Sequence, residues 1–171
     1  MRALITAEQI QRRVTELALE IGPQYRDRPL TIVGVLTGSL MFVADLVRRL
    51  EIPLRIGWIQ ASSYRGKTTT SGELKLGAER LSDVRGRHVL LLDDILDTGQ
   101  TLSYLVQHMH DQGALSVKVG VLLRKEGRQV HAVGVDFVGF DIPDAFVVGY
   151  GLDYNDEHRQ LPYIAALPPE S

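Results

Sequence analysis

The strongest constraint on the fold is a repeated change in the spacing of apolar residues along the chain. Short apolar runs rich in β-branched residues predict strands at 30–36 (LTIVGVL), 54–63 (LRIGWIQASS), 88–93 (HVLLLD) and 116–123 (SVKVGVLL). Apolar residues recur at helical spacing in segments 7–21, 37–50 and 101–112. Strands that alternate with helices indicate an α/β fold with a mainly parallel, twisted sheet flanked by helices.

The length of 171 residues fits a single domain that spans the whole chain, 1–171. Its core is expected to run from about residue 6, where Thr6 is a predicted N-cap, to about residue 140. Segment 136–168 is split by Gly and Pro and has no helical period, so together with the N-terminal segment it is expected to form a small irregular hood. Segment 63–77 (SYRGKTTTSGELKLG) is polar and is predicted to be a long functional loop.

Composition argues against several classes of function. The net charge of −2 provides no overall basic field for nucleic acid, and the absence of cysteine excludes disulfides and thiolate metal sites. The N-terminus lacks the apolar core of a signal peptide, and no apolar run approaches the roughly 20 residues of a membrane helix. The five histidines are scattered and match no zinc pattern. The expected location is therefore the cytoplasm. We expect no association with a membrane and no nucleic-acid partner.

Segment 89–101 (VLLLDDILDTGQT) places three carboxylates between an apolar strand and a small, hydroxyl-rich turn. The turn lies at the expected start of a helix, where backbone amides attract anions. The amides and hydroxyls suited to enclose one phosphate belong to Thr98, Gly99, Gln100 and Thr101. Carboxylates suit a sugar diol and Mg²⁺, so the segment predicts a ligand that combines diol, metal and phosphate. Alternatively, Asp97 only caps the helix and the acidic pair before it is a solvated turn.

The segment LLLDDILDTGQTL resembles the phosphoribosyl-pyrophosphate signature of the type I phosphoribosyltransferases. Further segments are similar, in order and spacing, to segments of the hypoxanthine-guanine phosphoribosyltransferases: GVLTGSLMFVADLVRRL, ASSYRGKTTTSGELKL, VGFDIPDAFVVGYGLDY and RQLPYI. The similarity runs from about Thr6 to Leu167. It implies the type I phosphoribosyltransferase fold, a sheet whose ligands bind beyond the carboxyl ends of the strands.

The resemblance also implies a role for each group of the signature. Asp93 and Asp94 match the acids that hold the ribose hydroxyls and the Mg²⁺ attached to them. Asp97 matches the proposed general base, which takes a proton from purine N7 as pyrophosphate leaves, and the turn at Thr98–Thr101 would hold the 5′-phosphate. Many relatives carry the longer Glu where this chain has Asp93, so its reach here is expected to run through water.

A purine site is implied by residues further along the chain. Lys125 matches the lysine that donates to the purine 6-oxo group, Phe146 the aromatic that stacks on the purine, and Val147 the residue whose backbone reads the base edge. Ile95 and Asp153 complete the expected purine-binding set, and Asp153 also matches the ligand of a second Mg²⁺. Taken as an isolated residue, Lys125 is more often a solvated surface lysine, but its position after an apolar strand favours the functional role. The alternative for Phe146 and Val147 is an ordinary core pair.

The leaving pyrophosphate would be held by Thr37, Gly38 and Arg159, according to the same resemblance. Arg suits a multidentate phosphate contact better than Lys does. The alternative for Arg159 is a surface ion pair with Asp156 or Glu157.

The resemblance also implies features of two loops, which begin at Thr37 and at Ser62. Many relatives have a basic residue at the position of Thr37, and many have a non-proline cis peptide that would lie between Leu36 and Thr37. Ser62, Ser63 and Tyr64 begin the mobile loop that closes over the reacting centre in relatives.

The leading hypothesis is a purine salvage enzyme that transfers the 5-phosphoribosyl group from 5-phosphoribosyl 1-pyrophosphate to hypoxanthine, and also guanine. It would need Mg²⁺ and act as a homodimer or homotetramer, as its relatives do. The alternative is a regulator on the same fold that binds RNA, of the pyrimidine attenuator type. Such a protein needs a basic face, for which the available residues are Arg2, Arg12, Arg13, Arg26, Arg28, Arg48 and Arg49. An aspartate-based phosphohydrolase is disfavoured because segment 93–98 (DDILDT) lacks the alternating Asp-x-Asp pattern.

Overall fold

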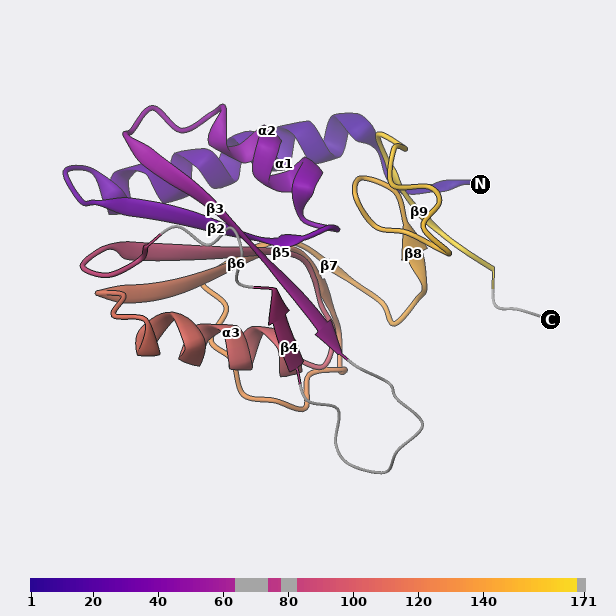
Figure 1. The fold of residues 1–171 in the computed structure, drawn as a ribbon. Coiled ribbons are helices and arrows are strands. Elements are labelled where there is room, and N and C mark those ends of the chain that lie inside the picture. Colours follow the sequence, from indigo (N-terminus) through magenta and orange to yellow (C-terminus); the bar gives the residue numbers. More distant parts are fainter. Residues whose placement is uncertain (64–73, 78–82, 169–171) are drawn as a thin grey trace, which may run out of the picture.

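The computed structural model describes residues 1–63, 74–77 and 83–168. Its centre is a twisted sheet with the spatial strand order β4 (Leu74–Gly77), β3 (Leu54–Ser63), β2 (Leu30–Leu36), β5 (His88–Leu96), β6 (Ser116–Lys125) and β7 (Phe137–Ile142). Strands β3, β2, β5, β6 and β7 are parallel, and β4 runs antiparallel to β3 at one edge (Figure 1). The predicted mainly parallel sheet is confirmed.

Helices cover both faces of this sheet. They are α1 (Ala7–Ile21), the short 3-10 helix η1 (Gly22–Tyr25), α2 (Leu40–Val47) and α3 (Gln100–Asp111). α1 and α2 lie on one face and α3 on the other (Figure 1). The predicted cap of α1 is confirmed, because the Thr6 side chain accepts the backbone N–H of Gln9 while the Gln9 side chain accepts that of Thr6. Within the described part of the chain, no helix has the length and apolar character that crossing a bilayer requires.

Two hydrophobic clusters hold the three layers together. The cluster between the sheet and the first two helices contains Ile10, Val14, Leu17, Phe42 and Leu46 among its buried side chains. The cluster on the opposite face buries the apolar side of α3 through Leu102, Leu105 and Met109. Because both faces of the central strands are covered, β2 and β5 are apolar almost throughout, as buried parallel strands must be.

A second, smaller sheet lies at one end of the molecule, to the right of the central sheet in Figure 1. Its strands are short and antiparallel, in the order β1 (Ala3–Ile5), β9 (Ile164–Ala166) and β8 (Val147–Val148). We call this sheet, with the connecting residues 143–163, the hood. The hood places the C-terminal loops beyond the carboxyl ends of the parallel strands.

Two segments differ from the sequence-based expectation. Leu74–Gly77, expected within the polar loop 63–77, forms β4 and pairs with the end of β3. Phe137–Ile142, expected among the irregular pieces of the hood, forms β7 and pairs in parallel with β6. In both cases a neighbouring strand supplies the backbone hydrogen bonds, and this long-range partner leaves no trace in the local composition.

Candidate active site

A small cavity of about 230 Å³ lies where the carboxyl ends of β5 and β6 meet the hood. Its lining consists of Asp94, Ile95, Asp97, Lys125, Phe146, Val147, Leu152 and Asp153. All of these residues except Leu152 are predicted site residues. Ligands of open parallel sheets bind beyond the carboxyl ends of the strands, so this cavity is the candidate active site.

Asp93 and Asp94 are neighbours at the end of β5 but lie in different environments. Asp93 is 9% exposed and is not part of the cavity lining, whereas Asp94 is half-buried and lines it. Burial, and then the charge of Asp94, raises the pKa of Asp93 well above its usual value. Burial also raises the pKa of Asp94, although the hydrogen bonds that it accepts and the charge of Arg159 oppose this rise. Two adjacent carboxylates, of which one is buried, are costly to ionise together unless a cation or a hydrogen-bond donor joins them.

Asp97 belongs to a cluster of four charged side chains beside the cavity. Its Oδ2 lies 3.5 Å from Nζ of Lys125, and its Oδ1 lies 3.0 Å from Nε of Arg128. Asp144 approaches the same two cations, at 3.5 Å from Lys125 and 3.7 Å from Arg128. The Lys125 side chain is only 12% exposed, so it is not a solvated surface lysine. The cluster holds the Lys125 ammonium next to Asp97 without burying an unpaired charge.

The turn between β5 and α3 leaves backbone amides available to an anion. α3 begins directly after Gly99, which has a φ of +86°, and no side chain caps the helix. The alternative reading, in which Asp97 caps this helix, is therefore wrong. A Cβ on Gly99 would lie 2.8 Å from the carbonyl oxygen of His131, so both the backbone angle and the space require glycine. The Thr98 carbonyl accepts two backbone N–H groups, from Val130 at 3.0 Å and from His131 at 2.9 Å, which secures the turn before α3.

The loop after β2 packs directly against the acidic end of β5. The peptide bond between Leu36 and Thr37 is cis, as the family resemblance implied. A Cβ on Gly38 would lie 1.8 Å from Oδ2 of Asp94, so the loop backbone touches this carboxylate. The Gly38 carbonyl oxygen in turn lies 2.1 Å from the position of a Cβ on Gly151 in the hood. Three segments of the chain thus meet at Gly38 with no room for a side chain.

The hood supplies one open aromatic face. Phe146 is 54% exposed and meets the ring of Tyr154 edge-on, with ring centroids 5.7 Å apart. Val147 is 5% exposed and continues into β8. The reading of these two residues as an ordinary core pair is therefore wrong for Phe146 and right for the Val147 side chain. The exposed Phe146 ring provides a flat surface at the cavity on which a planar ligand could stack.

Arg159 lies at the edge of the hood and is held by three contacts. It donates to the carbonyl oxygen of Gly151 at 2.7 Å, and its NH2 group lies 3.1 Å from Asp153 and 3.3 Å from Asp156. The ion pair with Asp156, considered as the alternative role of Arg159, is present. The pair with Asp153, however, joins Arg159 to the cavity lining. This guanidinium is positioned at the cavity rather than on a remote surface.

The acidic residues of the site could supply only some of the ligands of a Mg²⁺ ion. Mg²⁺ is usually bound by one or two carboxylates and takes its remaining ligands from water and substrate phosphates. Asp94 offers a carboxylate on the cavity wall whose ionised form is costly without a cation, and Asp153 already contacts Arg159. Among the residues that the structure describes, no group of three or more His, Cys, Asp or Glu side chains could enclose a metal ion. A substrate that carries phosphates would have to complete the sphere.

Two further groups of predicted residues lie next to residues of the cavity lining. The helix start from Thr98 to Thr101 directly follows Asp97, and the loop of Thr37 and Gly38 touches Asp94. Ser62 and Ser63 are the last residues of β3. Tyr64 lies outside the described residues.

Sequence reasoning missed three residues of this site: Arg128, Asp144 and Leu152. The sequence signal for these three residues is that each lies within a few positions of a predicted site residue. Spacing along the chain does not reveal that Arg128 turns back to Asp97, since this contact depends on how the loop after β6 folds.

Comparison with known proteins agrees with this geometry. A model of the phosphoribosyl transferase domain family matches residues 3–155. A hypoxanthine-guanine phosphoribosyltransferase of Bacillus subtilis is 44% identical over 168 residues, which are 98% of this chain and 93% of that protein. One from Mycobacterium avium is 42% identical, over 97% of this chain and 85% of that protein.

Solved structures of phosphoribosyltransferases are also similar to this fold. A hypoxanthine-guanine phosphoribosyltransferase from Bacillus anthracis has a TM-score of 0.92 at 38% identity, over 98% of this chain and 99% of that one. A hypoxanthine phosphoribosyltransferase from Staphylococcus aureus has a TM-score of 0.92 at 39% identity, over 98% of this chain and 91% of that one. Motifs, strand order and overall structure therefore agree, and the chain belongs to the type I phosphoribosyltransferase family.

Proposed function

We propose that this protein transfers the 5-phosphoribosyl group from 5-phosphoribosyl 1-pyrophosphate to hypoxanthine, and also to guanine, in purine salvage. The observation that carries the proposal is the position of Asp97. This carboxylate lines the cavity, contacts Lys125 and comes directly before the turn that starts α3. A purine in the cavity would lie beside the carboxylate, and a 5′-phosphate on the helix start would lie next to it. The names of the relatives support an oxopurine as the acceptor.

In the proposed reaction, Asp97 accepts the N7 proton of the purine. The purine nitrogen that becomes glycosidic forms its bond to the anomeric carbon, and the bond from that carbon to pyrophosphate breaks with its electron pair on the leaving oxygen. Positive charge that develops on the sugar ring is favoured by nearby carboxylates. Asp94, which lines the same cavity as Asp97, supplies such a group.

Purine recognition is assigned to Lys125 and the hood. The Lys125 ammonium has three donors, and a 6-oxo group would offer it an acceptor in place of Asp97. Adenine carries an amino group at this position, so a donor would face a donor, and adenine should be rejected. The exposed Phe146 ring would stack on the purine while the Val147 backbone reads its edge.

The sugar and pyrophosphate of the donor are assigned to the surrounding loops. Asp93 and Asp94 would hold the ribose hydroxyls, with Asp93 reaching through water because it lies behind the lining. Arg159, Thr37 and Gly38 would bind the leaving pyrophosphate. Bound Mg²⁺ would neutralise the pyrophosphate charge, with Asp93, Asp94 and Asp153 as the residues that hold it.

Steady-state assays with a panel of bases test this proposal. Hypoxanthine, guanine, xanthine, adenine and uracil would each be combined with the phosphoribosyl donor and Mg²⁺, and pyrophosphate release would be followed. Release that depends on hypoxanthine or guanine, and not on adenine or uracil, is the expected result. Release with uracil alone, or with no base of the panel, would overturn the assignment.

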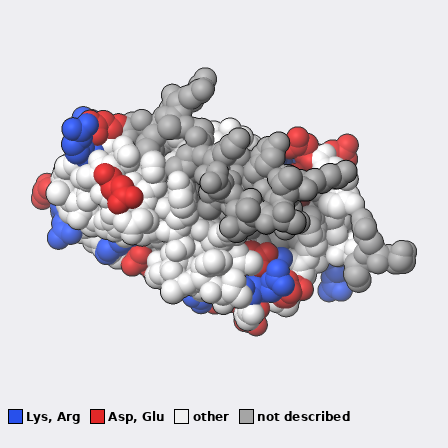
Figure 2. Space-filling view, turned by 60° about the horizontal axis from the view of Figure 1, so that its bottom comes forward, with Lys and Arg blue, Asp and Glu red and all other residues white. Residues whose placement is uncertain are grey.

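The proposed enzyme role is preferred to the regulatory RNA-binding role. On the face seen in Figure 2, basic and acidic side chains of the described residues are interspersed rather than gathered into one basic patch.

The location and the oligomeric state are also proposals. The cytoplasm is a suitable location for a chain without cysteine. A homodimer or homotetramer stays a prediction, which light scattering after size-exclusion chromatography would test.

A further inference from the structure

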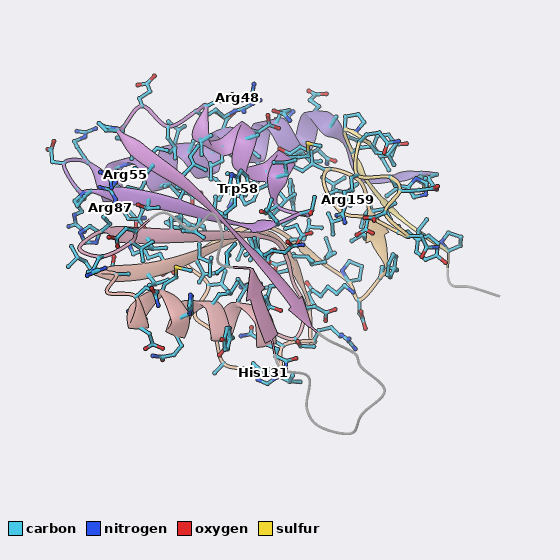
Figure 3. All side chains as sticks on the ribbon, in the orientation of Figure 1. Arg48, Arg55, Trp58, Arg87, His131 and Arg159 are labelled. Carbon is cyan, nitrogen blue, oxygen red and sulfur yellow. The ribbon has the colours of Figure 1, made fainter. Side chains whose placement is uncertain are left out.

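We propose a second ligand site, for a phosphorylated small molecule, at the opposite end of the sheet from the candidate active site. A pocket of about 450 Å³ opens there, beside the amino ends of β2, β3 and β5. Its lining includes the three arginines Arg28, Arg55 and Arg87. Figure 3 shows Arg55 and Arg87 together at this end of the sheet, while Arg159 lies at the far end beside the hood. The two sites therefore use different residues and different edges of the sheet.

Sheet topology brings the three arginines together. Parallel strands begin at the same edge, so residues at their amino ends converge although they are far apart in sequence. Arg55 lies near the start of β3, in register with Thr31 of the adjacent β2. Arg28 and Arg87 come shortly before β2 and β5, which pair with each other. The pocket is thus built from three segments at the amino ends of β2, β3 and β5, and not from one loop.

Arg87 is fixed in place with donors to spare. Its Nε–H donates to Oγ1 of Thr31 and its NH2 group to the carbonyl oxygen of Leu30, both at 2.7 Å. A guanidinium carries five N–H groups, so these two bonds orient the side chain and leave further donors for a ligand. Such an oriented guanidinium binds phosphate oxygens at little cost in side-chain entropy.

The lining of the pocket carries a net positive charge, because three arginines face one acid. Within the described residues, no carboxylate forms an ion pair with any of its three arginines, and the lining contains a single acid, Asp27. By contrast, carboxylate partners are present for Arg12, Arg13, Arg48, Arg85, Arg124, Arg128 and Arg159. Burial, and then the like charge of Arg55, lowers the pKa of Arg87. A bound anion would relieve this repulsion.

The other residues of the pocket lining favour an organic phosphate over inorganic phosphate. Pro29, Pro53 and Leu54 add rigid apolar surface next to the guanidinium groups. The volume lies within the range of roughly 300–1,000 Å³ that is common for small-molecule sites. Tyr25 also lines the pocket, and within the described residues its buried hydroxyl has no hydrogen-bond partner. Burial, and then the charge of Asp136, raises the pKa of Tyr25 to about 12, while the charge of Arg28 opposes this rise. The hydroxyl therefore keeps its proton and adds no negative charge to the pocket.

NMR titration of the full chain, labelled with ¹⁵N, tests this inference with adenosine monophosphate as the probe. The Nε–H signals of Arg55 and Arg87 and the amide of Leu54 report on the pocket, while the amide of Gly99 reports separately on the active site. We expect saturable shifts at the pocket, with an affinity at least about tenfold higher than that of inorganic phosphate. Because the reporters are local, the result does not depend on the proposed enzyme activity.

Two double variants with the same change in charge complete the test. Arg28→Gln with Arg55→Gln should weaken binding at the Arg87 reporter at least about tenfold and leave the Gly99 shifts unchanged. Arg2→Gln with Arg26→Gln, both exposed and outside the pocket lining, should leave both sets of shifts unchanged. The inference would be overturned by a missing saturable shift at Arg87, by equal losses in the two variants, or by inorganic phosphate binding as tightly as the nucleotide.

Discussion

Nζ of Lys125 lies 3.5 Å from Oδ2 of Asp97, so the proposed donor to the purine and the proposed general base contact each other beside the cavity. The contact joins the end of β6 to the loop after β5. A purine that used both groups would separate them, and Lys125 would keep Asp144 as a partner at 3.5 Å. Two substitutions can therefore distinguish the two roles.

Asp97→Asn should reduce kcat by about 10²–10⁴-fold, because the amide keeps the shape of the side chain but cannot accept the purine proton. Affinity for the phosphoribosyl donor, measured by calorimetry, should be retained. Asp141→Asn is the matched control, since Asp141 is a carboxylate that pairs with Arg124 away from the cavity lining. An unchanged kcat in Asp97→Asn would remove Asp97 from the role of general base.

Lys125→Met removes the ammonium group and keeps an unbranched side chain that is shorter by one heavy atom. The KM for hypoxanthine should rise by about 10- to 100-fold, because a charged hydrogen bond to the 6-oxo group is lost. The KM for the phosphoribosyl donor should stay the same. Lys118→Met, on the same strand but bonded to Gln24 at the surface, is the control and should leave both constants unchanged. A raised donor KM in place of a raised hypoxanthine KM would contradict the role given to Lys125.

The parts of the fold that were predictable from sequence depend on local patterns. The helix at 7–21 has its cap, Thr6, and its buried stripe within one segment, so the observed bounds of α1 match the prediction. The strand at 30–36 also matches, because burial on both faces imposes a continuous apolar run. β4 and β7 could not be placed in the sheet, since their assignment depends on pairing with β3 and β6.

The same distinction applies to the site. The acidic segment of β5 and the turn before α3 are contiguous, so their joint position at a strand end followed from the sequence. Phe146 and Lys125 could be named by family resemblance and not by spacing. The ion pairs of Arg128 and Asp144 with Asp97 and Lys125 required the structure, because a surface charge carries no sequence signal for its partner.

Gly38→Ala should disturb the site through Asp94. A Cβ at Gly38 would lie 1.8 Å from Oδ2 of Asp94, so the carboxylate or the loop must move. A displacement of this size at a reacting centre can cost about 10²-fold, and we expect kcat/KM for the phosphoribosyl donor to fall by that order. Gly22→Ala is the control, because a Cβ there meets nothing within 4 Å. Wild-type kinetics in Gly38→Ala would show that the contact with Asp94 has no role in donor binding.

Asp93→Asn should make the protein without donor more stable at neutral pH and less able to bind the donor with Mg²⁺. The folded-state pKa of Asp93 is raised above its usual 3.8, so ionisation of this group lowers the free energy of unfolding as the pH rises from about 4. The neutral amide keeps the acceptor for the Asp94 N–H, and urea denaturation at pH 7 should give a higher free energy of unfolding than that of the wild type. The Arg124 guanidinium lowers the pKa of Asp141, so Asp141→Asn should change stability in the opposite direction. Equal free energies of unfolding for Asp93→Asn and wild type between about pH 4 and pH 7 would mean that ionisation of Asp93 does not destabilise the folded protein.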